Sequence, residues 1–276
     1  MFTGFGISTE WESFQMSHSV FVEKVRLLFE TASKVFRRKV PASASYADKA
    51  VFHLGMLCFE DFKEILLLCA NGFGIGGQKI LRGLYEKTIT TDYLSAFPDA
   101  AQNFVDYTWV YMKRDLLHAK NEFGEETLDP GFIGHVMKEY DRVKDQFLNP
   151  RTGKPRTSWT ELSVEAMSKK VNNPLANWYY TCYFLPSQQI HSTIGAVYSR
   201  LKVHEQLDAT YFSTEPQRDE AIRVARNSHL LMLSVLQRQD EHFALGMENE
   251  LMERAKDFDS AWGFNAAVEI TGSQGM

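Results

Sequence analysis

Apolar residues recur at spacings of three and four along most of the chain, which is the pattern of amphipathic helices. The clearest run spans residues 17–35, where Phe21, Val25, Leu28 and Ala32 fall on one face. No convincing run of period-two alternation, the pattern of half-buried strands, appears anywhere. The chain is therefore predicted to be all-α, a single helical bundle of about eight to nine helices. They are expected over residues 17–35, 47–70, 75–97, 100–122, 130–147, 158–171, 174–184, 187–204 and 214–245.

Proline and glycine mark the expected ends of these helices. Asn71-Gly72 suits the left-handed C-cap of one helix, and the loop 149–157 contains two prolines and a glycine. That loop is the candidate for a soft boundary. We nevertheless expect one domain over residues 1–258, because each half of the chain carries one of the polar pairs described below. Residues 259–276 are small and polar, and we expect them to form a flexible tail.

Composition narrows the class of protein only slightly. Hydrophobic residues at 44% and charged residues at 24% are ordinary values for a globular protein, and the net charge of −5 gives no general attraction to nucleic acid or to an anionic membrane. Cys58, Cys69 and Cys182 lie in apolar runs without metal-ligand spacing, which favours buried free thiols in a reducing compartment. The N-terminus lacks the pattern of a signal peptide, and the longest apolar run, Ile65–Ala70, is too short to cross a bilayer. We therefore expect a cytoplasmic protein without a membrane segment.

A polar stripe interrupts the apolar face of the helix predicted over residues 75–97. Arg82 and Glu86 lie one helical turn apart, so they can form an ion pair, and Tyr93 continues the stripe. A second stripe lies in the helix predicted over residues 187–204. There Ser187 and His191 are one turn apart.

Tyr198 continues the second stripe beside apolar residues such as Ile190 and Ile194, which predicts that His191 faces inward. A buried charge without a partner costs several kcal/mol. The two helices are therefore expected to meet, so that these polar groups satisfy one another.

Two interpretations of this network stay open. It can be a structural network that fixes the register of the helices, or it can be a catalytic site in which His191 acts as acid and base. In the second interpretation Glu86 or Arg82 orients the histidine or stabilises charge. The ligand would then be bound by the remaining polar residues of the two stripes: Ser187, Tyr93 and Tyr198.

The segments LLLCANGFGIGGQKILRGLYEKTITTDYL and YFLPSQQIHSTIGAVYSRL, with Trp159 between them, carry a family resemblance. Over about residues 55–201 the chain resembles an uncharacterised group of bacterial helical proteins, known only as a domain of unknown function. That group has an R-x3-E helix followed by an S-x3-H helix. The resemblance implies an all-helical fold and importance for Arg82, Glu86, Ser187 and His191, and it implies no activity.

The sequence gives little support for specific metal-binding or phosphate-binding sites. A ferritin-like di-metal site needs Glu-x-x-His on two helices, and no such motif occurs, so we expect no metal and no cofactor. The glycine cluster of residues 72–77 would need a preceding strand to be a phosphate loop, whereas a helix is predicted there. The cluster is better explained by a helix cap and a close helix contact, with an anion site at the helix N-terminus as the alternative.

Arg223 and His229 form an R-x5-H pattern that looks like the ribonuclease motif of HEPN-type helical proteins, which are common among bacterial toxins and phage-defence systems. Chance alone gives about one such match in a chain of this composition. His229 also falls on an apolar stripe, where a core histidine is the default. Two functions are thus predicted: a self-associating interaction module, forming a homo-oligomer and binding a partner or small molecule, or a metal-independent ribonuclease acting on RNA. Whether the protein is an enzyme stays open between them.

Overall fold

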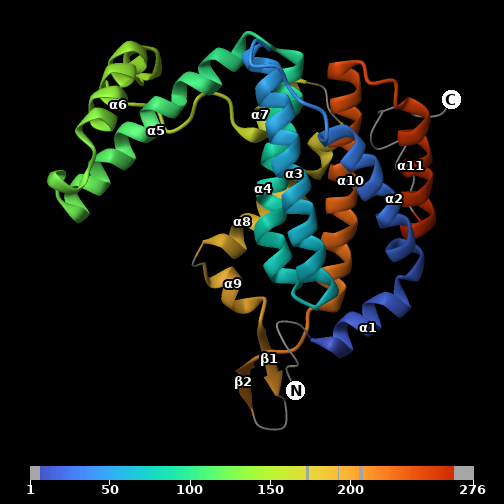
Figure 1. The fold of residues 1–276 in the computed structure, drawn as a ribbon. Helices are drawn as coiled ribbons and strands as arrows, with labels where there is room; N and C mark the ends of the chain where they lie inside the picture. The colour runs from blue at the N-terminus through green and yellow to red at the C-terminus, as the bar shows by residue number, and fades with distance from the viewer. Residues whose placement is uncertain (1–6, 172–173, 192, 205–207, 264–276) are drawn as a thin grey trace. The chain divides into compact units, whose positions relative to one another are not determined.

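A computed structural model describes residues 7–171, 174–191, 193–204 and 208–263, and these residues are predominantly α-helical (Figure 1). The all-α prediction is confirmed. The longer helices are α2 (Ser19–Phe36), α3 (Tyr46–Ala70), α4 (Gly74–Ala96), α5 (Ala100–Phe123), α6 (Pro130–Val143), α10 (Arg218–Phe243) and α11 (Glu248–Trp262). The shorter helices are α1 (Ser8–Ser17), α7 (Val164–Lys170), α8 (Leu185–Ile190) and α9 (Ile194–Tyr198).

One short antiparallel hairpin interrupts the helical chain. Strand β1 (Leu201–His204) pairs with β2 (Ala209–Phe212), with Leu201 opposite Phe212 and Val203 opposite Thr210. The expectation that no strand occurs is wrong here, and residues 201–204 are not the end of a helix. Four residues of apolar–polar alternation are too few to be separated from a helix end by pattern alone. The remaining short elements are the 3-10 turns Glu125–Thr127, Lys144–Phe147 and Pro174–Trp178, and the π-helical turn Tyr180–Phe184.

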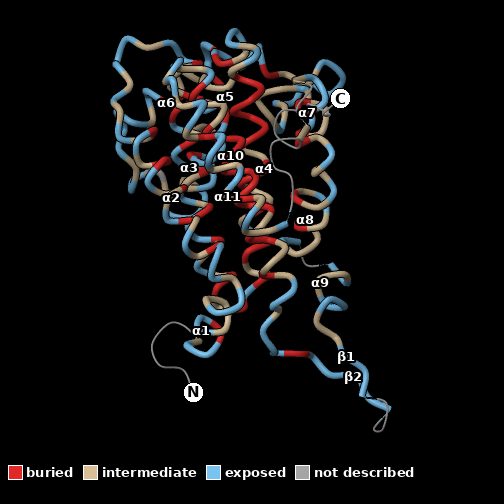
Figure 2. The backbone as a smooth tube through the Cα atoms, turned by 90° about the vertical axis from the view of Figure 1, so that its right-hand side faces the viewer, coloured by how far each residue is buried: buried red, intermediate tan, exposed pale blue. Residues whose placement is uncertain are grey.

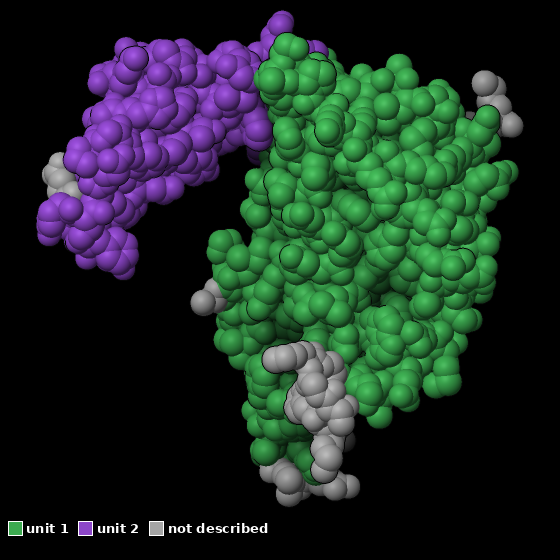
Figure 3. Space-filling model, viewed as in Figure 1, with its two compact units in different colours: residues 1–44, 48–96, 164–276 green, residues 45–47, 97–163 purple. Residues whose placement is uncertain are grey.

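The larger of two compact units comprises residues 1–44, 48–96 and 164–276 (Figure 3). In it, α10 packs against α4 and α11, and α11 packs against α2. The predicted apolar stripe of α2 is buried, from Phe21 through Val25 and Leu28 to Ala32. Helix α10 is buried at most positions between Ala221 and Leu236, which places it in the core of this unit (Figure 2).

Two glycines allow α4 and α10 to pack closely. A Cβ atom on Gly74 would lie 2.5 Å from the backbone nitrogen of Ala221, and one on Gly77 would lie 3.0 Å from a methyl group of Val224. Gly72 has a φ of +76°, which is the left-handed conformation expected where α3 ends. The glycine cluster is therefore explained by a helix end and a close helix contact.

The smaller compact unit comprises residues 45–47 and 97–163 (Figure 3). Its core is formed between α5 and α6 by Tyr107, Val110, Val143 and Phe147. The loop 149–157 belongs to this unit: the Tyr107 hydroxyl donates a hydrogen bond to the carbonyl of Arg156 at 2.6 Å. The loop therefore lies within the smaller unit, and the chain passes between the two units at residues 44–45, 47–48, 96–97 and 163–164.

Helix α11 continues to Trp262, so the first part of the predicted flexible tail is helical, and residues 264–276 lie outside the described residues. Among the described helices, none combines the length and the apolar character that crossing a bilayer would need.

Candidate polar site between α4 and α8

Arg82 is the centre of a polar network that joins α4 to the segment leading into α8. Its Nη1 atom donates a hydrogen bond to Glu86 Oε2 at 3.0 Å, one turn along α4. Its Nε atom donates to Ser187 Oγ at 3.0 Å, and its Nη2 atom donates to Tyr183 Oη at 2.7 Å. One guanidinium therefore holds two side chains of the later segment, and the predicted meeting of the two polar helices is confirmed.

The backbone of the later segment explains why Tyr183 and Ser187 approach Arg82 together. The π-helical turn Tyr180–Phe184 leads directly into α8, and Pro186 lies in the first turn of α8. Proline has no backbone N–H and its ring crowds the carbonyl four residues earlier, so a wider π turn accommodates it where an α-helix would kink. The Ser187 hydroxyl donates to the Tyr183 carbonyl at 2.7 Å. This bond turns the Ser187 oxygen lone pairs toward the guanidinium.

The Tyr183 ring adds stacking to the hydrogen bonds. The guanidinium carbon of Arg82 lies 4.4 Å from the centre of this ring, within the range of a cation–π contact. Tyr179 stacks on Tyr183 with ring centres 5.2 Å apart and planes inclined by 23°. Burial raises the pKa of Tyr183, and the nearby Glu86 carboxylate raises it further, so the phenol stays neutral and accepts from Arg82. The network thus contains one cation, one anion and neutral hydroxyl groups, and it can hold a segment or orient a polar ligand.

His191 does not belong to this network. Helix α8 ends at Ile190, and His191 adopts an extended conformation with φ −86° and ψ 147°. Its side chain is exposed. The prediction that His191 faces inward is therefore wrong, because the helix on which that prediction depended stops one residue too early.

The two other predicted ligand-binding residues also lie apart from Arg82. Tyr93 is buried near the C-terminal end of α4, and its ring centre is 5.7 Å from the ammonium nitrogen of Lys170. Tyr198 is 65% exposed at the end of α9. The network therefore unites only Arg82, Glu86 and Ser187 from the predicted set.

Arg223 pairs with Glu220 one turn earlier on α10, and not with His229. Its guanidinium donates two hydrogen bonds to the Glu220 carboxylate from Nη2, at 2.6 and 2.7 Å, and Gln78 donates to the same carboxylate. Gln78 lies one turn before Arg82 on α4, so it continues the polar stripe toward the start of α10. Arg223 is therefore part of the surface between α4 and α10.

His229 lies inside an aromatic cage and is only 1% exposed. Its ring centre is 4.9 Å from that of Phe258 and 5.6 Å from that of Phe21, and its Nδ1 atom accepts a hydrogen bond from Trp262 Nε1 at 3.1 Å. Burial lowers the pKa of His229 to about 3. A neutral imidazole packed in this way has no path to a substrate, so its position matches a core histidine.

The described residues contain no group of three or more histidine, cysteine, aspartate or glutamate side chains that could hold a metal ion. Cys58, Cys69 and Cys182 are free and buried, as expected, and burial raises the pKa of each thiol to about 12. These thiols are protonated at neutral pH and unsuited to nucleophilic chemistry.

Sequence reasoning missed Tyr183, the second hydroxyl that Arg82 holds. Tyr183 lies four residues before Ser187, which is the same spacing that drew attention to His191 on the other side. Tyr183 lies in a run of aromatic residues, 178–184, whose pattern indicates an aromatic surface and singles out no one phenol. The signal that could have identified Tyr183 is its position one helical turn before Ser187, a residue already predicted to be polar and inward-facing.

The fold and this network define an all-α protein in which a half-buried polar network joins α4 to the segment around α8. A family model described as Family of unknown function (DUF5677) matches residues 48–208, and the chain belongs to that family. The matched region includes both helices of the Arg82 network. No curated protein and no solved structure matches the chain.

Proposed function

We propose that this protein is a self-associating interaction module, in which the segment 180–212 of one copy docks on the same segment of a second copy. The observation that carries the proposal is a concentration of exposed apolar side chains in this segment. Among the described residues of the segment, nine large hydrophobic side chains are exposed: Tyr180, Phe184, Ile190, Ile194, Val197, Tyr198, Val203, Tyr211 and Phe212. A gathering of exposed apolar side chains marks interaction sites more often than single exposed side chains do.

The exposed side chains are ordered by the local structure and not scattered. On α9, Ile194, Val197 and Tyr198 follow the i, i+3, i+4 spacing of a single helix face. In the hairpin, the register and the alternation of side chains place Val203 and Phe212 on one sheet face. Two four-residue strands with an uncovered apolar face are marginally stable alone, which favours a partner that covers them.

The exposed apolar area of the segment is close to the area that one partner buries in a protein dimer. The hairpin register places Tyr211 on the other sheet face, which leaves at most eight of these residues for one surface. With about half of a side-chain surface of roughly 150–200 Å² exposed at each, they offer on the order of 700 Å², close to the area that one partner contributes to a standard interface. Two-fold dimers bury the same patch on both copies, so a self-complementary apolar surface is sufficient.

The Arg82 network supports this function by holding the segment on α4. The three hydrogen-bond acceptors of Arg82 among the described residues, on Glu86, Ser187 and Tyr183, all belong to the protein itself. The network contains no histidine, because His191 lies outside it. These features favour the interpretation that the network positions an interaction surface. They do not favour the interpretation that it is a catalytic centre.

The test measures the mass of the protein in solution across a range of concentrations by sedimentation velocity. We expect the wild-type protein to form a dimer and Tyr198→Ser to shift it toward monomer. Leu67→Ser is the matched control, since Leu67 on α3 is also 65% exposed but lies outside the segment. A wild-type monomer at every concentration, or equal effects of the two variants, would refute the proposal.

The bacterial origin, the cytoplasmic location and the alternative of a HEPN-like phage-defence ribonuclease stay predictions from the sequence. No feature of the described site favours the ribonuclease over the interaction module, and the Discussion gives its test.

A further inference from the structure

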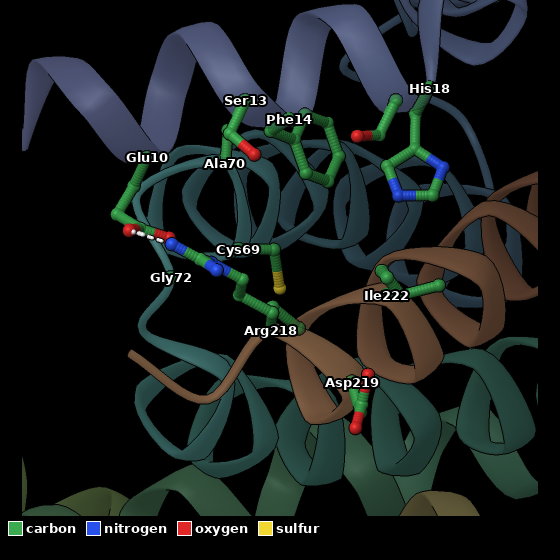
Figure 4. Close-up of a pocket in the computed structure, with 12 residues that line it drawn as sticks. Glu10, Ser13, Phe14, His18, Cys69, Ala70, Gly72, Arg218, Asp219 and Ile222 are labelled. Carbon is green, nitrogen blue, oxygen red and sulfur yellow. Dashed lines mark hydrogen bonds and ion pairs between the residues drawn. The ribbon is translucent and has the colours of Figure 1, made fainter. Parts of the chain in front are cut away.

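A cavity of about 190 Å³ lies between α1, the end of α3 and the first turns of α10 in the larger unit. Figure 4 shows Phe14 and His18 on the wall formed by α1 and the start of α2, and Cys69 and Ile222 on the opposite wall. It shares no lining residue with the segment 180–212.

Two polar contacts hold α1 over this cavity. The backbone N–H of Ile7 donates to Asn71 Oδ1 at 3.0 Å, and Arg218 donates two hydrogen bonds to the buried Glu10 carboxylate, at 2.8 and 2.6 Å. The Arg218 guanidinium lowers the pKa of Glu10, so the carboxylate stays charged and the ion pair closes one end of the cavity.

The middle of the cavity is apolar and uncharged. Phe14 and Ile222 contribute hydrocarbon, and the buried Cys69 thiol is protonated. An apolar cavity of about 150 Å³ is large enough to hold benzene, so this cavity has room for one substituted ring.

The other end of the cavity offers hydrogen bonds without charge. Burial lowers the pKa of His18, which keeps the imidazole neutral and able both to donate and to accept. The side chains of His18, Ser13 and Ser17 line the cavity, and none of them makes a hydrogen bond to another described residue. A ligand group that donates or accepts one hydrogen bond would therefore find a partner here.

We propose that the cavity beneath α1 is a binding site for a small neutral aromatic molecule that carries one hydrogen-bonding group. The ring occupies the space between Phe14 and Ile222, and its polar group meets His18. An anionic ligand is disfavoured, because the Arg218 cation in the lining is already paired with Glu10 and Asp219 adds a further carboxylate. This site is independent of the proposed self-association.

Phenol is the probe, and its binding is measured by titration calorimetry on the full chain. We expect saturable binding by the wild-type protein and a loss of at least about tenfold in Ser13→Leu, whose larger side chain enters the cavity from the peripheral helix α1. Leu67→Phe, an enlargement at an exposed position, is the matched control and should bind as the wild type does. Benzoate should bind at least about tenfold more weakly than phenol.

The proposal is overturned if the wild type shows no saturable binding, or if Ser13→Leu binds phenol as tightly as Leu67→Phe does. Benzoate binding as tightly as phenol would overturn the neutral class of ligand.

Discussion

The buried His229 should make the stability of the protein depend on pH in a defined window. Its pKa is about 3 in the folded protein, against an ordinary value of 6.5. Between these values the unfolded chain binds a proton at this histidine and the folded chain does not. Stability therefore rises with pH across the window, and it is lost as the pH falls from about 6.5 toward 3.

The size of the effect follows from the two pKa values. One pH unit inside the window is worth about 1.4 kcal/mol, so lowering the pH from about 7 to 5 should cost about 2 kcal/mol at this residue. The variant that removes the effect is His229→Phe, because an aromatic ring can occupy the cage formed by Phe21, Phe62 and Phe258. Trp262 loses its acceptor in this variant, which lowers stability at every pH but adds no titrating group.

The assay is urea unfolding of both proteins at pH 7, 6 and 5, with the difference in unfolding free energy taken at each pH. We expect the wild type to lose about 2 kcal/mol more than His229→Phe between pH 7 and 5. His191→Gln is the control for removing an exposed histidine and should follow the wild type. Equal pH dependence in the wild type and His229→Phe would refute the argument that this histidine is buried and neutral.

Three further predictions concern the network, the helix contact and the ribonuclease alternative. Arg82→Met should lower the unfolding free energy by about 2–3 kcal/mol in urea unfolding, because three hydrogen bonds to a charged group are lost. Gly74→Ala should destabilise by about 1–3 kcal/mol through its clash with Ala221, whereas Gly134→Ala in α6, whose Cβ meets nothing within 4 Å, should stabilise by up to about 1 kcal/mol. We expect no RNA cleavage by the wild type with or without EDTA; EDTA-resistant cleavage that disappears in His229→Ala would instead establish the ribonuclease.

Local periodicity was enough to predict most of the long helices. The stripe of α2 from Phe21 to Ala32 is buried as its spacing requires, because side chains three and four apart share a face. The approach of Arg82 to Ser187 was also predictable, since a charge on an apolar face needs a partner. Both arguments depend on a continuous helix, and they hold where the helix is continuous.

The same arguments failed where the helix changes its geometry. A π-helical turn precedes Pro186, and α8 ends at Ile190, so short pieces replace one regular helix. The four-residue spacing from Ser187 to His191 therefore does not place the two side chains on the same helix face. The hairpin that follows has strands too short to show a reliable alternation. The loop 149–157 has the composition of a linker, but its hydrogen bonds tie it to α5, and such tertiary contacts leave no trace in composition.

The distinction between a structural network and an active site depends on where the hydrogen-bonding groups point. Both need polar groups that satisfy one another, so residue types and spacing alone do not separate them. In the structure, Ser187 donates to Tyr183 and accepts from Arg82, so both functions of its hydroxyl are directed at the protein. The exposed surface nearby is apolar. It is formed by side chains of the segment 180–212, which the network holds against α4. Because the hydrogen bonds of this half-buried network are made within the protein, they favour the proposed interaction surface over the alternative of a catalytic site.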